Sequence, residues 1–173
     1  MNRFPVCFQH DSMLCGITCL LMICKYFGRD YTLESLSKIC FATTEGVSML
    51  GINEAARILG FQTVSARATI EELSETPLPC ILYWNQNHFV VLYKMKKGKK
   101  FYIADPGKGK TTYNLEEFKR HWISTRSNDE DKGIAMFFET TPAFFTYQME
   151  GEDRQKEKRS FKFLFRYFKK YRK

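Results

Sequence analysis

The sequence predicts an α+β fold in which N-terminal helices pack on an antiparallel sheet. Within residues 15–60, two apolar runs have helical spacing and each ends at a glycine. After Pro79 the pattern changes to short β-branched and aromatic runs joined by turns. The chain has 173 residues, of which 44% are hydrophobic and 16% aromatic, so it can form one domain with a sizeable core.

Start and stop signals predict four helices in the N-terminal half, over residues 15–27, 33–40 and 49–59 and briefly before Pro77. The first is densely apolar and precedes Gly28, which is typical of the residue after a buried helix. Thr32 and Ser48 can cap the second and third helices. Thr69 and Glu72 have the spacing of a capping box for the fourth.

The C-terminal half is predicted to form strands over residues 80–84, 88–95, 100–104 and 133–139. A short Asn-rich turn joins the first two, and Lys97-Gly98 makes the next turn. The third strand stops at Asp105-Pro106-Gly107, which favours a tight turn. Between the last two strands, Asn114 caps a helix that runs to about Trp122.

Charge is distributed unevenly along the chain, whose formal net charge is +8. Residues 154–173 hold ten lysines and arginines and one acid, whereas the rest holds 17 basic and 18 acidic residues. The globular part is therefore neutral by count, and we expect it to present no extended basic face. This balance argues against a nucleic-acid-binding domain.

Composition predicts three regions along the chain. Residues 1–141 form the globular domain, residues 142–160 a charged linker, and residues 161–173 a basic amphipathic helix. The apolar side chains of that helix recur at helical spacing, at Phe161, Leu164, Phe165 and Phe168. No run of about 18 apolar residues occurs, so the sequence predicts no membrane-spanning helix.

The six cysteines are predicted to be reduced thiols in a cytosolic protein; they are Cys7, Cys15, Cys19, Cys24, Cys40 and Cys80. The N-terminus lacks the basic and apolar regions of a secretory signal. Cys15 and Cys19 lie four residues apart, but no second pair of cysteines or histidines completes four ligands. We therefore expect no metal site, and no glycine-rich phosphate loop opens a helix.

Cys15 is the candidate nucleophile because it begins a predicted helix. A thiol attacks a carbonyl as its thiolate, which the positive end of the helix dipole and a histidine partner both stabilise. Gly16 leaves the approach to the thiol open. The alternative is that Cys15 is a buried helix thiol like Cys19 and Cys24.

His88 and Asp105 are candidates for the base and its orienting residue. His88 begins an apolar strand, and Asp105 follows the neighbouring one. In an antiparallel pair the start of one strand lies beside the end of the next, which brings the two side chains together. The alternatives are a satisfied core histidine and an ordinary turn aspartate. His10 is too near Cys15 in the chain, and His121 ends a surface-type helix.

Gln9 is the candidate oxyanion donor. It lies six residues before Cys15, so that its side-chain amide and the Cys15 backbone N–H could both donate to a developing oxyanion. With a nucleophile, a base and an orienting residue, this donor completes the set of groups needed for cysteine-dependent acyl transfer.

Four ordered blocks of the sequence resemble the C39 peptidase domain of bacterial peptidase-containing ABC transporters, at residues 9–28, 46–61, 78–94 and 104–109. The resemblance spans about residues 5–140. It implies a papain-like fold and cleavage after a Gly-Gly pair that ends the leader of a bacteriocin or related peptide. It also implies that Cys15 is the nucleophile, His88 the base, Asp105 the orienting residue and Gln9 the oxyanion donor.

The resemblance further implies the partners and the location of the domain. The partners are a Gly-Gly precursor peptide and the transmembrane and nucleotide-binding domains of an exporter, at the cytoplasmic face of the bacterial inner membrane. The peptidase domain needs no cofactor, and ATP belongs to the transporter part. A basic aromatic segment like residues 161–173 precedes the first transmembrane helix in this family, so we expect an excised domain or a separate peptidase that meets the membrane through this tail.

One residue departs from the family pattern, because Leu14 occupies the place where an acidic residue usually precedes the nucleophile. Two other functions stay open at this level. The first is a module that docks leader peptides without cutting them, which loss of the cysteine or histidine would indicate. The second is a peripheral membrane-binding protein that depends on its basic tail.

Overall fold

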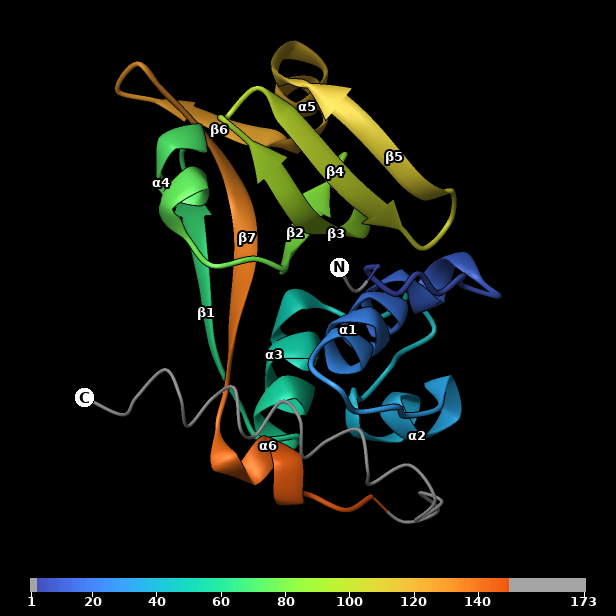
Figure 1. The fold of residues 1–173 in the computed structure, drawn as a ribbon. Helices are drawn as coiled ribbons and strands as arrows, with labels where there is room; N and C mark the ends of the chain where they lie inside the picture. The colour runs from blue at the N-terminus through green and yellow to red at the C-terminus, as the bar shows by residue number, and fades with distance from the viewer. Residues whose placement is uncertain (1–2, 150–173) are drawn as a thin grey trace, which may run out of the picture.

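The structure is a computed structural model, and residues 3–149 are described from it (Figure 1). Its helical elements are the 3₁₀ helix η1 (Ser12–Leu14) and the helices α1 (Cys15–Tyr26), α2 (Leu33–Ile39), α3 (Met49–Ile58), α4 (Ile70–Glu75), α5 (Leu115–Trp122) and α6 (Pro142–Thr146). Its strands are β1 (Phe61–Ala68), β2 (Cys80–Trp84), β3 (His88–Lys96), β4 (Lys100–Asp105), β5 (Gly109–Asn114), β6 (Ile123–Ser127) and β7 (Glu130–Thr140).

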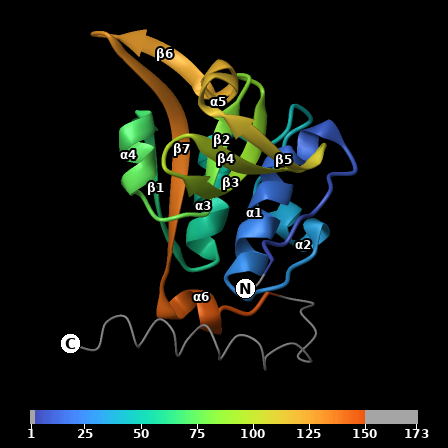
Figure 2. The same ribbon diagram turned by 45° about the horizontal axis from the view of Figure 1, so that its top comes forward.

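The strands form one antiparallel sheet in the order β1-β7-β2-β3-β4-β5, and β6 pairs with β7. Helices α1, α2 and α3 lie together on one side of the sheet, and α5 lies against the strands on the other (Figures 1 and 2). The predicted α+β class, with N-terminal helices packed on an antiparallel sheet, is confirmed. Within residues 3–149, every helix is too short or too polar to cross a bilayer.

The strands β1, β5 and β6 were not predicted from the sequence. The first two are the edge strands of the sheet, and most of their side chains are exposed or half-buried. In β1 only the end residues, Phe61 and Ala68, are buried. An edge strand of this kind has little apolar surface to bury, so it leaves no alternating apolar pattern in the sequence.

The central strands bury both of their faces. In β2, Ile81 belongs to the core that includes α1, while Leu82 and Trp84 belong to the core that includes Phe118 and Trp122 of α5. Successive side chains of a strand point to opposite faces, so a strand covered on both sides is apolar throughout. This explains the continuous apolar runs from which β2 and β3 were predicted.

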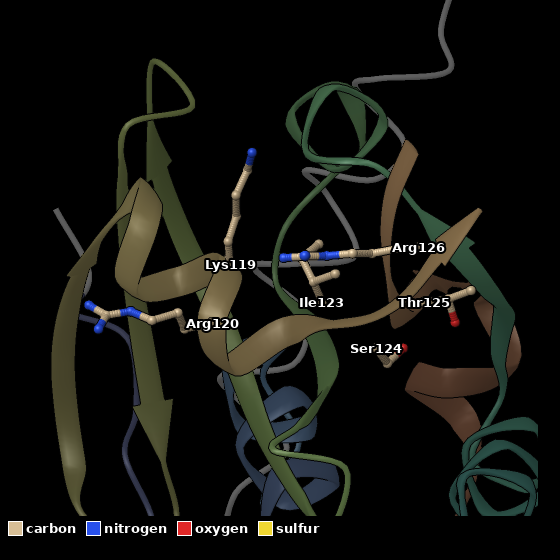
Figure 3. A pocket seen from close by; sticks show the side chains of 6 residues that line it. All are labelled: Lys119, Arg120, Ile123, Ser124, Thr125 and Arg126. Carbon is tan, nitrogen blue, oxygen red and sulfur yellow. The ribbon is translucent and has the colours of Figure 1, made fainter. Parts of the chain in front are cut away.

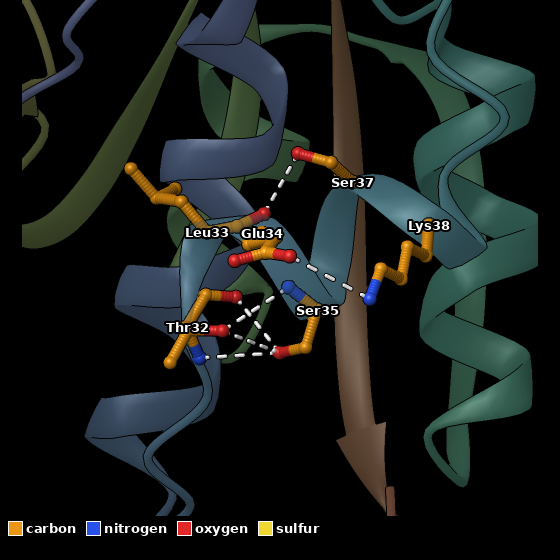
Figure 4. Close-up of polar contacts among 6 residues, drawn as sticks. All are labelled: Thr32, Leu33, Glu34, Ser35, Ser37 and Lys38. Atoms are coloured by element: carbon orange, nitrogen blue, oxygen red, sulfur yellow. Dashed lines mark hydrogen bonds and ion pairs between the residues drawn. The ribbon is translucent and has the colours of Figure 1, made fainter. Parts of the chain in front are cut away.

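The predicted helix caps are present, and Figure 4 shows the one that starts α2. Thr32 Oγ1 accepts a hydrogen bond from the Ser35 backbone N–H at 3.1 Å, and Ser35 Oγ accepts one from the Thr32 N–H at 3.2 Å. In the same turn Lys38 pairs with Glu34 at 3.6 Å (Figure 4). These bonds satisfy N–H groups that the first turn of a helix leaves without partners.

A close helix–sheet contact depends on Gly16. A Cβ at this position would lie 2.8 Å from Ile52 Cδ1 of α3 and 3.3 Å from Phe89 Cδ2 of β3. Glycine therefore lets the first turn of α1 approach both elements. That turn begins at Cys15, so this packing holds Cys15 against the start of β3.

The predicted domain boundary after residue 141 is too early. Helix α6 returns to the domain and buries Phe144 completely, with its ring 4.3 Å from that of Phe61. Thr141 Oγ1 donates to the Gly60 carbonyl at 2.6 Å, and Gly60 packs directly on the backbone of α6. This apolar segment is short and charged residues follow it, so the composition of the whole region indicated a linker. The rest of the predicted linker and the tail helix lie outside the described residues.

We predict that Phe144→Ala lowers the free energy of unfolding by about 3–5 kcal/mol, because it leaves a cavity among packed aromatic rings. Phe41→Ala is the matched control, since Phe41 is 69% exposed. The control should change stability by less than about 0.5 kcal/mol. Urea denaturation of both variants measures the difference, and equal stabilities would place α6 outside the folded domain.

Candidate active site

Cys15 is placed by the junction of two helices. Asp11 Oδ1 accepts a hydrogen bond from the Met13 N–H at 2.9 Å and so caps η1, which runs directly into α1. Leu14, the residue that departs from the family pattern, is half-buried and packs against the helical core. Cys15 is 8% exposed at the first position of α1. Its thiol is thus near the positive end of the helix dipole.

His88 and Asp105 meet as the strand order predicted. His88 is the first residue of β3, and Asp105 is the last residue of the adjacent β4. His88 Nε2 lies 2.9 Å from Asp105 Oδ1, and the Gly107 N–H donates to the same oxygen at 2.7 Å. Asp105 is only 2% exposed, so these two bonds replace the water that its carboxylate has lost.

The His88 imidazole, whose Nε2 is engaged by Asp105, is near enough to influence the pKa of the Cys15 thiol. Burial, the largest influence, raises the pKa of the thiol. Hydrogen bonds from His88 and from the Phe89 backbone, the nearby charge of His88, and a Gly16 backbone bond together outweigh burial, and the pKa lies below its ordinary 9.0. The site therefore favours a thiolate.

The same contacts act on the histidine. Burial is again the largest influence and lowers the pKa of His88, but hydrogen bonds to Asp105 and Cys15 and their negative charges raise it to about 9. The pKa of Asp105 is lowered, because bonds from His88 and Gly107 overcome the opposing effect of burial. At neutral pH His88 is therefore an imidazolium beside the Asp105 carboxylate, and the lowered pKa of Cys15 favours a thiolate next to it.

Gln9 lies beside the turn that follows Asp105. Its backbone N–H donates to the Pro106 carbonyl at 2.9 Å, and its Nε2 would be 3.7 Å from a Cβ built on Gly107. Its Oε1 is buried and has no hydrogen-bond partner among the described residues. The structure thus joins the segment before α1 to the Asp105 turn, and the oxyanion role of Gln9 stays a prediction.

The turn before His88 is supported by contacts that were not predicted from the sequence. Asn85 and Gln86 have positive φ angles of 51° and 59°, a conformation that non-glycine residues rarely adopt. The backbone carbonyl of His121 accepts a hydrogen bond from the Asn85 N–H at 2.9 Å. The His121 ring nitrogen Nδ1 lies 2.7 Å from Asn85 Oδ1. The ring of His121 also stacks on Trp84 at 5.0 Å. His121 is thus half-buried and fixes this turn, rather than merely ending a surface helix; the Asn-rich turn was the available signal.

The other cysteines differ from Cys15 in their surroundings. Burial raises the pKa of Cys40 to about 12. It also raises the pKa values of Cys19 and Cys80 strongly. No disulfide joins any of the six. Among residues 3–149 no group of three or more histidines, cysteines and acids could hold a metal ion.

A hollow of about 360 Å³ lies where α5 meets β6 (Figure 3). It is lined by Lys119, Arg120, Ile123, Ser124, Thr125 and Arg126. The Arg120 side chain points away from Arg126 in this view, and Arg126 is paired with Asp131 at 3.1 Å. No catalytic candidate lines the hollow.

A thiol at the start of a buried helix, facing a histidine and an aspartate on adjacent strands, is the arrangement of a cysteine peptidase. The chain belongs to the Peptidase C39 family, whose sequence model matches residues 3–127. It is 36% identical over 121 residues to the microcin-H47 secretion/processing ATP-binding protein MchF and 35% identical over 121 residues to the colicin V secretion/processing ATP-binding protein CvaB, both of Escherichia coli. Each alignment covers 70% of this chain and 17% of the relative.

Solved structures agree with this assignment. A double glycine motif protease from an AMS/PCAT transporter, crystallised with a leader peptide, is 35% identical with a TM-score of 0.70, over 80% of this chain and 93% of that one. The peptidase domain of Streptococcus ComA is 24% identical with a TM-score of 0.67, over 80% of this chain and all of that one, and shows the shared fold. The papain-like peptidase fold expected from the sequence is thus confirmed.

We predict that His88→Ala lowers the rate at which iodoacetamide alkylates Cys15 at pH 7 by at least about tenfold. Without the imidazole, the His88 influences that lower the pKa of the thiol are lost, so the pKa rises and the midpoint of the rate against pH moves to higher pH. Mass spectrometry of the peptide that carries Cys15 measures this rate. An unchanged midpoint would contradict the coupling of Cys15 to His88.

Proposed function

We propose that the chain is a cysteine endopeptidase that removes the leader of a bacteriocin-like or other exported peptide after a Gly-Gly pair. The observation that carries this proposal is that Cys15, at the start of α1, has its pKa lowered by His88, which is hydrogen-bonded to Asp105. The substrate class is supported by the leader-bound double glycine motif protease, which shares 35% of its sequence with this chain.

In the proposed reaction the Cys15 thiolate attacks the carbonyl carbon of the second glycine. The carbonyl oxygen becomes an oxyanion, to which the Gln9 side-chain amide and the Cys15 backbone N–H donate. His88, protonated in the resting state, gives its proton to the leaving amine as the peptide C–N bond breaks. Water, deprotonated by His88, then hydrolyses the thioester and releases the leader.

Asp105 has an orienting role in this scheme. Its bond to His88 Nε2 leaves the other ring nitrogen, Nδ1, for the thiol and stabilises the imidazolium. Cys15 itself is 8% exposed, so the reacting carbonyl must come close to the surrounding walls. Two glycines suit such a site because they carry no side chains that would collide with it.

The partners in the proposed function are a Gly-Gly precursor and the remaining domains of an exporter. The chain spans 17% of the length of the curated relatives, whose names describe secretion and processing ATP-binding proteins. We place the domain at the cytoplasmic face of the membrane, with ATP bound only by the transporter part and no cofactor in the peptidase. Membrane contact through residues 161–173 belongs to this proposal.

The non-cleaving docking module is the second candidate for this site. It would share the fold and the leader specificity but would lack a working nucleophile or base. Both are present here, and their pKa values are shifted toward the charged pair that catalysis requires. This observation favours the peptidase.

We predict that Cys15→Ala and His88→Ala each abolish cleavage of a synthetic Gly-Gly leader peptide while the fold is retained. Cys80→Ala is the control, because Cys80 is a buried thiol that faces the core on the other side of the sheet. It should change stability but not the rate per folded molecule. Cleavage is followed by chromatography; a Cys15→Ala variant that cuts at the normal rate would exclude the assignment.

We predict that Gln9→Ala lowers kcat by about 10²–10³, the usual effect of losing one oxyanion donor, with little change in leader affinity. Steady-state kinetics and peptide binding to the same variant separate these quantities. Because the Gln9 backbone bond to Pro106 survives the substitution, the loop stays anchored. An unchanged kcat would assign Gln9 a structural role.

A further inference from the structure

Four lysines gather on one face of the sheet, although the domain is neutral by count. They are Lys94 and Lys96 of β3, Lys100 of β4 and Lys110 of β5, and we call them, with Tyr93 and Tyr102, the lysine–tyrosine face. The expectation that the domain presents no extended basic face was therefore wrong. A count over the whole domain averages out charges that the sheet brings together.

Strand register puts these side chains on the same face. Lys94 lies directly opposite Tyr102, and Lys96 lies opposite Lys100. Lys110 lies opposite Ala104, two residues along β4 from Tyr102, and so shares its side of the sheet. Like charges directly opposite each other destabilise a strand pair, so folding alone does not account for this arrangement.

The ammonium groups surround the two tyrosine rings. Three of them lie near the Tyr102 ring centroid: Lys94 Nζ at 5.2 Å, Lys100 Nζ at 5.7 Å and Lys96 Nζ at 6.0 Å. Lys110 Nζ lies 5.4 Å from the centroid of Tyr93, and the two rings are 6.3 Å apart. Cation–π attraction to these two rings favours four ammonium groups close together on this face.

Acidic partners for this area are lacking in the part of the chain that the structure describes. None of the four lysines forms an ion pair there. Residues 88–114 contain seven lysines and one acid, the buried Asp105, which is engaged by His88. The pKa of Lys110 is lowered, first by loss of solvent around its ammonium group and then by the charge of Arg3. An anionic partner is the complement that this face lacks.

The tyrosines argue for a lipid surface rather than a nucleic acid. Single-stranded nucleic acids stack their bases on open aromatic rings. Here Phe4 stacks on Tyr93 at 4.7 Å, and ammonium groups crowd the Tyr102 ring. Tyrosine with lysine is instead typical of the bilayer interface, where an apolar ring and a charged tip are both accommodated. The relatives MchF and CvaB are named as secretion proteins, and secretion requires transport across a membrane.

We propose that the lysine–tyrosine face binds anionic lipid head groups and holds the folded domain against the bilayer. The lysines would meet lipid phosphates, as basic residues at a negatively charged leaflet do. The face adjoins the active site, because Lys110 follows Gly109, which pairs with Asp105 across the β4–β5 turn. The surface is distinct from the tail, and its test uses no peptidase activity.

The test compares two variants of the full chain that remove the same charge. The face variant carries K94Q, K96Q, K100Q and K110Q, and the matched control carries K38Q, R57Q, R67Q and R120Q, which are exposed cations outside the face. Sedimentation with phosphatidylcholine vesicles that contain phosphatidylglycerol, and with phosphatidylcholine vesicles alone, measures affinity near physiological salt. Circular dichroism confirms that both variants fold.

We expect the face variant to lose at least about tenfold in affinity for the anionic vesicles, and the control less than about twofold. Both variants keep residues 150–173, so the tail contributes equally to each. Equal losses in the two variants, or no loss in the face variant, would overturn the proposal. So would a face variant that loses binding to a single-stranded oligonucleotide while its vesicle binding is unchanged. Peptide cleavage by the face variant should stay normal, which separates this inference from the proposed function.

Discussion

The site depends on the buried carboxylate of Asp105. Burial disfavours the charged form of Cys15, of His88 and of Asp105 alike, and the neighbouring groups of the series oppose this effect in each of them. Asp105 also accepts a hydrogen bond from a fixed donor, the Gly107 N–H at 2.7 Å. The carboxylate of Asp105 stabilises the charged form of His88, and the charged form of His88 in turn favours the thiolate of Cys15.

The fold supplies the positions that this charge series requires. Gly16 lets α1 approach β3, the β3–β4 pairing brings His88 to Asp105, and the His121 contacts hold the turn that precedes His88. These contacts come from three parts of the chain far apart in sequence. Sheet and helix packing therefore fix the reacting groups before any peptide binds, which lowers the reorganisation needed for reaction.

The sequence predicted what depends on local pattern. The helix caps at Thr32 and Asn114 and the apolar central strands follow from short-range rules, and antiparallel order sufficed to bring His88 to Asp105. What it missed depends on tertiary contact. Edge strands bury too little to show a pattern, Phe144 is recognisable as core only once α6 folds back, and the role of His121 requires knowing that α5 ends beside the β2–β3 turn.

The central claim is that His88 of the unliganded protein is already an imidazolium, paired with Asp105, and ¹⁵N NMR of the imidazole nitrogens over a pH series tests it directly. We expect His88 to be protonated at pH 8 and to lose its proton at about 9. His121 is the internal control, because burial and nearby cations lower its pKa and it should be neutral at that pH. A His88 ring that is already neutral at pH 8 would contradict the account.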